Sequence, residues 1–179
     1  SSIEEVLERL RRLSDEVRKR TDDVLERARE ISRETEERSR RINEEIERIV
    51  EELKKRADKD MVEKVKRDAE ELLKKSEDLH RRVIETLRRL VERVREIHEE
   101  TIRRLEELLK KVEDELKGGD KEAVDRARRE VERLVKENED ILKRLEEEVR
   151  KLVKRNEDLV EENRREVEKW RKELEDRKR

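Results

Sequence analysis

The pattern that decides the fold is three consecutive stretches of 18 residues: MVEKVKRDAEELLKKSED (61–78), LHRRVIETLRRLVERVRE (79–96) and IHEETIRRLEELLKKVED (97–114). Apolar residues recur at matching positions of the three stretches, for example Leu87 and Leu105. At about 100° per residue these positions fill one arc of roughly 120°, which is typical of an amphipathic α-helix. Eighteen residues in five turns give about 3.6 residues per turn, the natural period of the helix, so we predict helices that run nearly straight.

The same repeat extends over the rest of the chain. Adding 18 to the apolar positions of residues 3–17 leads to the matching positions of 21–35, and residues 123–138 map likewise onto 141–156. Every Ala, Val, Ile, Leu, Met and Trp lies on one of three such faces, although charged residues make up 60% of the chain. A disordered chain would lack this periodicity and a strand would alternate with a period of two, so the pattern predicts an all-α protein with a charged exterior.

Capping residues and one pair of glycines indicate where the helices begin and end. Ser2 and Asp60 each precede a Glu by three residues, which is the spacing of a capping box, and Asp120 follows the only two glycines of the chain. The link at residues 56–60 contains no Gly. A continuous helix would, however, rotate its apolar face by roughly 130° at this point, and this favours a break.

We therefore predict helices at about 3–57, 61–117 and 121–177, in a single domain over residues 1–179. Short links between helices of similar length make neighbouring helices antiparallel. The predicted fold is all-α: a long, nearly straight, antiparallel up-down-up three-helix bundle. Apolar arcs of about 120–140° suit a helix that contacts two neighbours in a closed trio.

Polar residues interrupt the apolar faces, and we predict that they form buried polar networks. They are Ser14, Thr21, Ser32, Thr35, Ser39, Asn43, Ser76, His80, His98, Thr101, Asn138, Asn156 and Asn163. A buried amide or imidazole without a partner costs about 1–3 kcal/mol, so these groups are expected to meet and to disfavour slipped registers. The alternative is that each of them bonds water or a carbonyl one turn back on its own helix.

The predicted topology also places these residues at common heights. Facing residues of the first two helices have numbers that sum to about 118, and those of the last two sum to about 237. The expected layers are His98 with Thr21 and Asn138, His80 with Ser39, Thr35 and Asn156, and Ser76 with Asn43 and Asn163.

The chain resembles de novo designed helical bundles that carry buried hydrogen-bond networks. The 18-residue repeat, the polar core residues, the Gly118-Gly119-Asp120 link, the charged surface and the single Trp170 match that style over the whole chain. The resemblance implies a structural scaffold without a natural biochemical function. It also allows one member of a designed heterodimer, in which the networks encode the choice of partner.

Motifs and composition argue against catalysis and against several kinds of ligand. There is no Cys, and the two histidines lie ~27 Å apart along one helix, too far to share a metal ion. Glu77 and His80 have the spacing of a di-metal site, but the matching residue before His98 is Arg95. A net charge of −2 gives no basic patch for nucleic acid, and no apolar run reaches the ~18 residues of a membrane span. We expect no enzyme activity, cofactor, metal or small-molecule substrate.

The remaining predictions concern assembly and pH. We expect a monomer; the alternative is a binding module whose three helices accept a complementary fourth helix. A pH-responsive bundle is a further alternative, because neutral His80 and His98 in a core would make stability fall below about pH 6.5. No targeting segment opens the chain, so its compartment is not predicted, although such a chain suits cytoplasmic recombinant expression.

Overall fold

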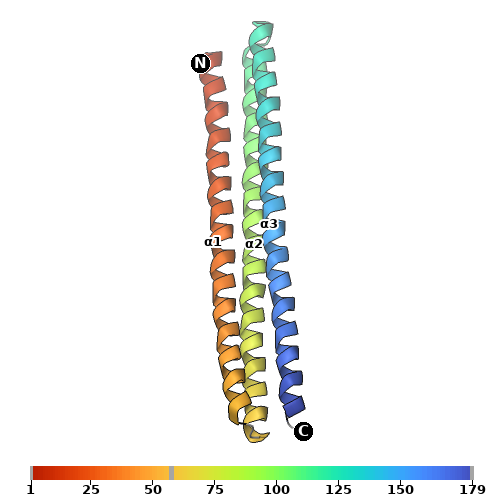
Figure 1. Cartoon of the computed structure of the whole chain (residues 1–179). Helices are drawn as coiled ribbons and strands as arrows, with labels where there is room; N and C mark the ends of the chain where they lie inside the picture. Colours follow the sequence, from red (N-terminus) through yellow and green to blue (C-terminus); the bar gives the residue numbers. More distant parts are fainter. Residues whose placement is uncertain (1, 57–58, 178–179) are drawn as a thin grey trace. The chain divides into compact units, whose positions relative to one another are not determined.

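The described residues form three long α-helices (Figure 1). In the computed structural model, which describes residues 2–56 and 59–177, α1 spans Ile3–Arg56, α2 spans Lys59–Glu115 and α3 spans Lys121–Arg177. The all-α fold and the break between the first two helices are confirmed. Ala57 and Asp58, predicted to end the first apolar face and to form the turn, lie outside the described residues.

The predicted caps at the starts of α1 and α3 are present. The backbone N–H of Glu5 donates to Oγ of Ser2 at 3.3 Å. Before α3, Oδ1 of Asp120 accepts the backbone N–H of Glu122 at 3.0 Å and that of Ala123 at 3.3 Å. Each cap satisfies backbone donors that have no partner within the first turn of a helix.

Both ends of α2 differ from the prediction. The helix begins at Lys59 and not at residue 61, so Asp60 lies inside the first turn, where its carboxylate favours the positive end of the helix dipole. The helix ends two residues before 117, because Gly118 has a φ of 83°, a left-handed conformation that glycine adopts without strain. The N–H of Gly119 then donates to the carbonyl of Leu116 at 2.8 Å and closes the turn.

The described chain divides into two compact units, and each unit contains a segment of all three helices. Unit 1 consists of Ser1–Arg27 with Arg88–Val149, and unit 2 consists of Ala28–Leu87 with Arg150–Arg179. Within each unit the three segments pack as a three-helix bundle. A single domain over residues 1–179 stays a prediction.

Within each unit α1 and α3 run in the same direction. In unit 1, contacting residues of the two helices differ by constant numbers, 119 for Arg11 with Glu130 and 124 for Ser14 with Asn138. The same two offsets recur in unit 2. A constant difference means that residue numbers rise together along two parallel helices.

The middle helix runs antiparallel to α3. In unit 1, Glu113 of α2 pairs with Arg128, and Arg95 pairs with Glu146, so numbers fall on α2 as they rise on α3. The ion pairs of unit 2 follow the same order. The up-down-up arrangement of a three-helix bundle is thereby confirmed within each unit.

Aliphatic side chains from all three helices form the core of each unit. In unit 1 the buried cluster is Leu7, Leu10, Leu105, Val112, Ala127, Val131 and Leu134. In unit 2 it is Ile46, Val50, Leu53, Val62, Val65, Ala69, Val167, Trp170 and Leu174. Burying one such Val or Leu side chain is worth about 1.5–3 kcal/mol, so these clusters stabilise the fold without Phe or Tyr.

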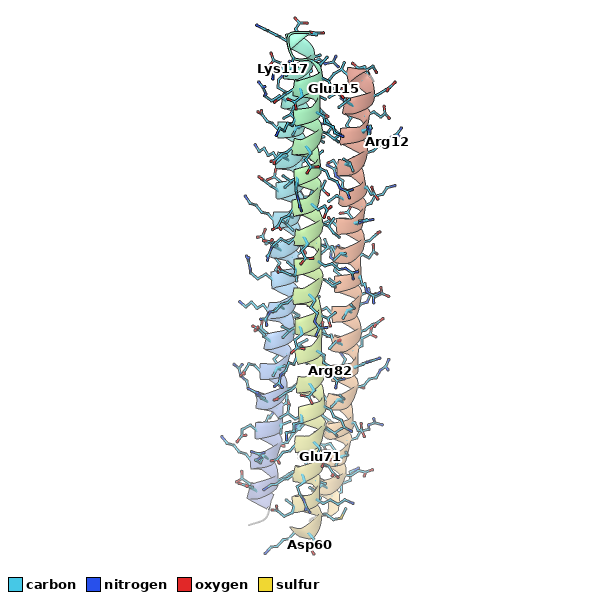
Figure 2. The ribbon with its side chains drawn as sticks, turned by 180° about the vertical axis from the view of Figure 1, so that it is seen from behind. Arg12, Asp60, Glu71, Arg82, Glu115 and Lys117 are labelled. Atoms are coloured by element: carbon cyan, nitrogen blue, oxygen red, sulfur yellow. The ribbon has the colours of Figure 1, made fainter. Side chains whose placement is uncertain are left out.

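Charged side chains cover the outside of the helices. Figure 2 shows them extending outward along the ribbons, with Arg12 and Arg82 among those labelled. Many pair within one turn of their own helix, as Arg12 does with Glu8 at 3.5 Å, and such exposed pairs are worth only tenths of a kcal/mol. Along residues 2–56 and 59–177, none of the helices has the length and apolar character needed to cross a membrane.

Candidate functional site

The polar residues predicted for the core lie on the inner faces of the helices. All except Asn43, which is partly buried, expose at most 6% of their surface. His80, Asn138 and Asn156 expose none. Polar groups at this depth need hydrogen-bond partners inside the protein, so their contacts decide what these positions do.

In unit 1, His98 of α2 contacts Thr21 of α1. Its Nε2 lies 2.9 Å from Oγ1 of Thr21, whose hydroxyl also donates to the carbonyl of Val17 at 2.8 Å. A hydroxyl has one hydrogen, so the Thr21 oxygen accepts from the ring, and the neutral ring carries its hydrogen on Nε2. Nδ1 is then a buried acceptor, and it has no hydrogen-bond partner.

Asn138 of α3 bonds to α1 in the same unit. Its Nδ2 donates to Oγ of Ser14 at 3.1 Å and to the carbonyl of Leu134, one turn back, at 2.7 Å. A carbonyl only accepts, so this contact determines the orientation of the amide, and Oδ1 is left buried without a partner. The three residues expected in one layer thus form two separate contacts, His98 with Thr21 and Asn138 with Ser14.

In unit 2, His80 of α2 bonds to Asn156 of α3. The ring Nδ1 lies 2.8 Å from Oδ1 of Asn156, whose Nδ2 donates to Ser32 of α1 at 3.1 Å and to the carbonyl of Leu152 at 2.8 Å. Oδ1 is therefore an acceptor, and the His80 ring must donate from Nδ1. Nε2 of His80 is buried without a partner.

A second cluster of unit 2 joins all three helices through Asn163. Its Nδ2 donates to Oγ of Ser39 on α1 and to Oγ of Ser76 on α2, both at 2.9 Å. The two serine hydroxyls lie 2.9 Å from each other, and Oδ1 of Asn163 accepts from Nδ2 of Asn43. Ser39 thus belongs to this cluster and not to the His80 layer in which it was expected.

Thr35 and Thr101 complete the set. The hydroxyl of Thr101 donates to the carbonyl of Ile97 at 2.8 Å, one turn back on α2, and Thr35 is buried on α1. Bonds to the same helix are thus present together with bonds between helices, as each of the two interpretations of the sequence required.

Burial lowers the pKa of both histidines. For His80, the hydrogen bond to Asn156 and the charge of Glu36 partly oppose this effect on the pKa; for His98, the backbone of Asn138 opposes it. The unfolded chain then binds protons more readily than the folded one. The free energy of unfolding should therefore be highest above about pH 6.5 and fall as the pH drops towards the lowered pKa values.

Ion pairs between helices lie beside the polar clusters and were not predicted. Arg155 of α3 donates to Glu36 of α1 at 2.6 Å, and Arg11 of α1 donates to Glu130 of α3 at 3.0 Å. The hydrogen bond from Arg133, supported by that from Arg11, holds the pKa of Glu130 below its usual value. The signal that could have revealed these pairs is the constant offset of 119 between an Arg on one helix and a Glu on the other.

The described side chains do not gather into a metal site. Glu77 accepts a hydrogen bond from Nε of Arg164 at 2.7 Å, while His80 is bonded to Asn156. Within residues 2–56 and 59–177, no group of three or more His, Asp or Glu side chains is placed to hold a metal ion.

Comparisons with known proteins give one similar structure. No protein-family model matches the chain, and no curated protein matches it. The chain is similar to a solved structure described as a computationally designed three helix bundle, with 23% sequence identity over 98% of this chain and 89% of that chain, at a TM-score of 0.48. The fold described above follows from the helices and contacts of the chain itself.

Proposed function

We propose that this chain is a structural scaffold of the designed kind, in which buried polar contacts specify which helices pair and in which register. The observation that carries the proposal is the cluster around Asn163, because one amide bonds to two other helices at once. The 18-residue repeat supports it, since it makes the apolar faces alike along each helix and leaves them little power to discriminate between registers.

The cost of a wrong register follows from these contacts. A shift of α3 by one helical turn, about 5 Å, would remove Asn163 from both Ser39 and Ser76. Each buried polar group left without a partner costs about 1–3 kcal/mol, whereas the aliphatic contacts would largely be replaced by others of the same kind. The polar groups therefore favour the native register more strongly than the apolar groups do.

The test is a variant in which all the buried polar residues become aliphatic. We expect it to unfold at a higher denaturant concentration but to form several assemblies, seen by light scattering, with poorly dispersed amide resonances. A matched control converts the same number of exposed Glu and Lys residues to Gln. A single assembly with well-dispersed spectra, equal to the parent, would remove the proposed role.

The same proposal gives the chain no catalytic role. The side chains that could do chemistry are engaged in structural contacts, His98 with Thr21, and Ser76 with Ser39 and Asn163. A buried serine that bonds to two neighbours is poorly placed to attack a substrate, because it would have to break these contacts first. Absence of hydrolysis of activated esters above the rate of a Ser76→Ala variant is the expected result.

A second candidate is a binding module that accepts one amphipathic helix on unit 1. A groove between α1 and α2 is lined by Leu13 and Val17 on one side and by Ile97 and Leu108 on the other. Three of these residues are partly exposed and Val17 is buried. Partly exposed aliphatic residues along a groove suit the apolar stripe of a helix.

The charged borders of this groove support the second candidate. Arg20 pairs with Glu16, and Arg104 pairs with Glu100, so each of these ion pairs joins residues of one helix. Charges arranged in this way leave the groove open to a partner. The contacts between α3 and the other two helices of unit 1, in contrast, include ion pairs between helices.

Mass and shape in solution separate the two candidates. The scaffold predicts a particle of 22.1 kDa by light scattering. A larger particle that returns to this mass on Leu13→Lys, but not on the control Leu25→Lys in the groove between α1 and α3, would favour the binding module.

A further inference from the structure

The two histidines occupy equivalent positions of the repeat but are bonded through different ring nitrogens. His98 and His80 are 18 residues apart on α2, as Asn138 and Asn156 are on α3. His80 donates from Nδ1 to Asn156, whereas His98 uses Nε2 for its contact with Thr21. The neutral rings are therefore opposite tautomers, and each keeps one buried acceptor nitrogen without a partner.

In the His98 layer, an added proton meets an acceptor that has no other partner. Nδ1 of His98 and Oδ1 of Asn138 are both buried and unpaired, and two acceptors cannot bond to each other. A proton on Nδ1 turns that nitrogen into a charged donor. Asn138 can then accept from it, and the backbone of the same residue already favours the charged ring.

In the His80 layer, an added proton meets no such acceptor. Nδ1 already carries the hydrogen that is donated to Asn156, so a second proton must go to Nε2. The oxygen of Asn156 is occupied by Nδ1, and its amide nitrogen is a donor to Ser32. Protonation therefore places a charge and a new N–H group in the core of unit 2 without a matching acceptor.

Charged groups on each packed helix bear on this comparison. Around the level of His98 they are Glu16, Arg18, Arg20 and Asp22 on α1, Arg93, Glu96 and Glu100 on α2, and Glu137, Asp140 and Arg144 on α3. Around His80 they are Glu36 on α1, Glu77 and Arg81 on α2, and Arg155, Asp158 and Arg164 on α3. Glu36 favours a charged His80, but its carboxylate already accepts from Arg155 at 2.6 Å.

We propose that His98 and Asn138 form a proton-binding site that is filled while unit 1 stays packed, whereas protonation of His80 opens unit 2. The repeat thus contains one acid-tolerant and one acid-labile layer. This inference does not depend on the scaffold proposal, because it concerns the response of two side-chain clusters to acid and not the choice of register.

The experiment is a pH titration of the full chain, followed by ring nitrogen chemical shifts and by backbone amide exchange. Near pH 8 the shifts should report the Nε2–H tautomer for His98 and the Nδ1–H tautomer for His80. On acidification, His98 should become charged while the core amides of unit 1 remain protected. His80 should become charged only as unit 2 loses protection, with an opening equilibrium that rises by up to about tenfold per pH unit.

Two variants test the roles of the acceptors. In Asn138→Leu, His98 should become charged only together with loss of protection in unit 1; unchanged behaviour would overturn the proposal. In Glu36→Gln, His80 should behave as in the parent. The titration of the parent chain is decisive without any variant. A charged His80 in a protected unit 2, tautomers opposite to those assigned, or charging of both rings only on global unfolding would each overturn the proposal.

Discussion

Replacing Asn163 by Leu should lower the free energy of unfolding by about 2–4 kcal/mol. In the folded chain the amide nitrogen donates to two buried hydroxyls, Ser39 and Ser76, and the amide oxygen accepts from Asn43. Each buried polar group that loses a partner costs about 1–3 kcal/mol. The two serines keep their bond to each other and Asn43 is partly exposed, so the cost for each group stays near the lower end of this range.

Guanidinium unfolding followed by far-ultraviolet circular dichroism measures this loss. The exposed Glu166→Gln on the same helix is the control, with an expected change below about 0.5 kcal/mol. The triple variant Ser39→Ala, Ser76→Ala, Asn163→Leu removes both sides of the contacts and should recover most of the stability. A change for Asn163→Leu equal to that of the control, or a triple variant no more stable than Asn163→Leu, would refute the reasoning.

Four further outcomes are expected. Leu87→Ala, at a side chain with no exposed surface, should cost about 2–5 kcal/mol in denaturant unfolding, and a cost below 1 kcal/mol would contradict its place in a packed core. Gly118→Ala should cost about 1 kcal/mol because of its positive φ, since nothing lies near the added methyl group. Glu130→Gln should cost about 1 kcal/mol near neutral pH, and the difference should vanish as the pH falls below 4.5 and through the lowered pKa of Glu130; a difference that persists in acid would exclude the ion pair as its cause. The parent chain should unfold at a lower denaturant concentration at about pH 5 than at about pH 7.5, because burial lowers the pKa of both histidines, and equal midpoints would contradict this.

The fold could be predicted from the sequence because one rule governs every helix. The positions that share a face with Leu87 and Leu105 recur every 18 residues, and burial of these faces leaves the charged positions outside. The ends of α2 were predicted less well. Its C-terminal end depends on which residue adopts the left-handed conformation, and with two adjacent glycines the sequence does not show that it is Gly118.

The contents of the polar clusters were harder to predict than their heights. The sum rule compares helix levels, but a hydrogen bond depends on rotamers and on the stagger between side chains. Asn138 illustrates this, because it contacts Ser14 at an offset of 124 and not the residues near Thr21 at its own level. Ser39 likewise bonds to Ser76 and Asn163, since two hydroxyls and an amide can satisfy one another completely.

The recurrence of the same two offsets along α1 and α3 makes the length of the molecule adjustable. Ser14 with Asn138 and Ser32 with Asn156 are the same contact displaced by one repeat. The 18-residue repeat therefore acts as a unit cell in one dimension. Removing or inserting one cell in all three helices would keep the facing partners of the cells that remain, so the chain can be shortened or extended in steps of about 27 Å without choosing new core residues.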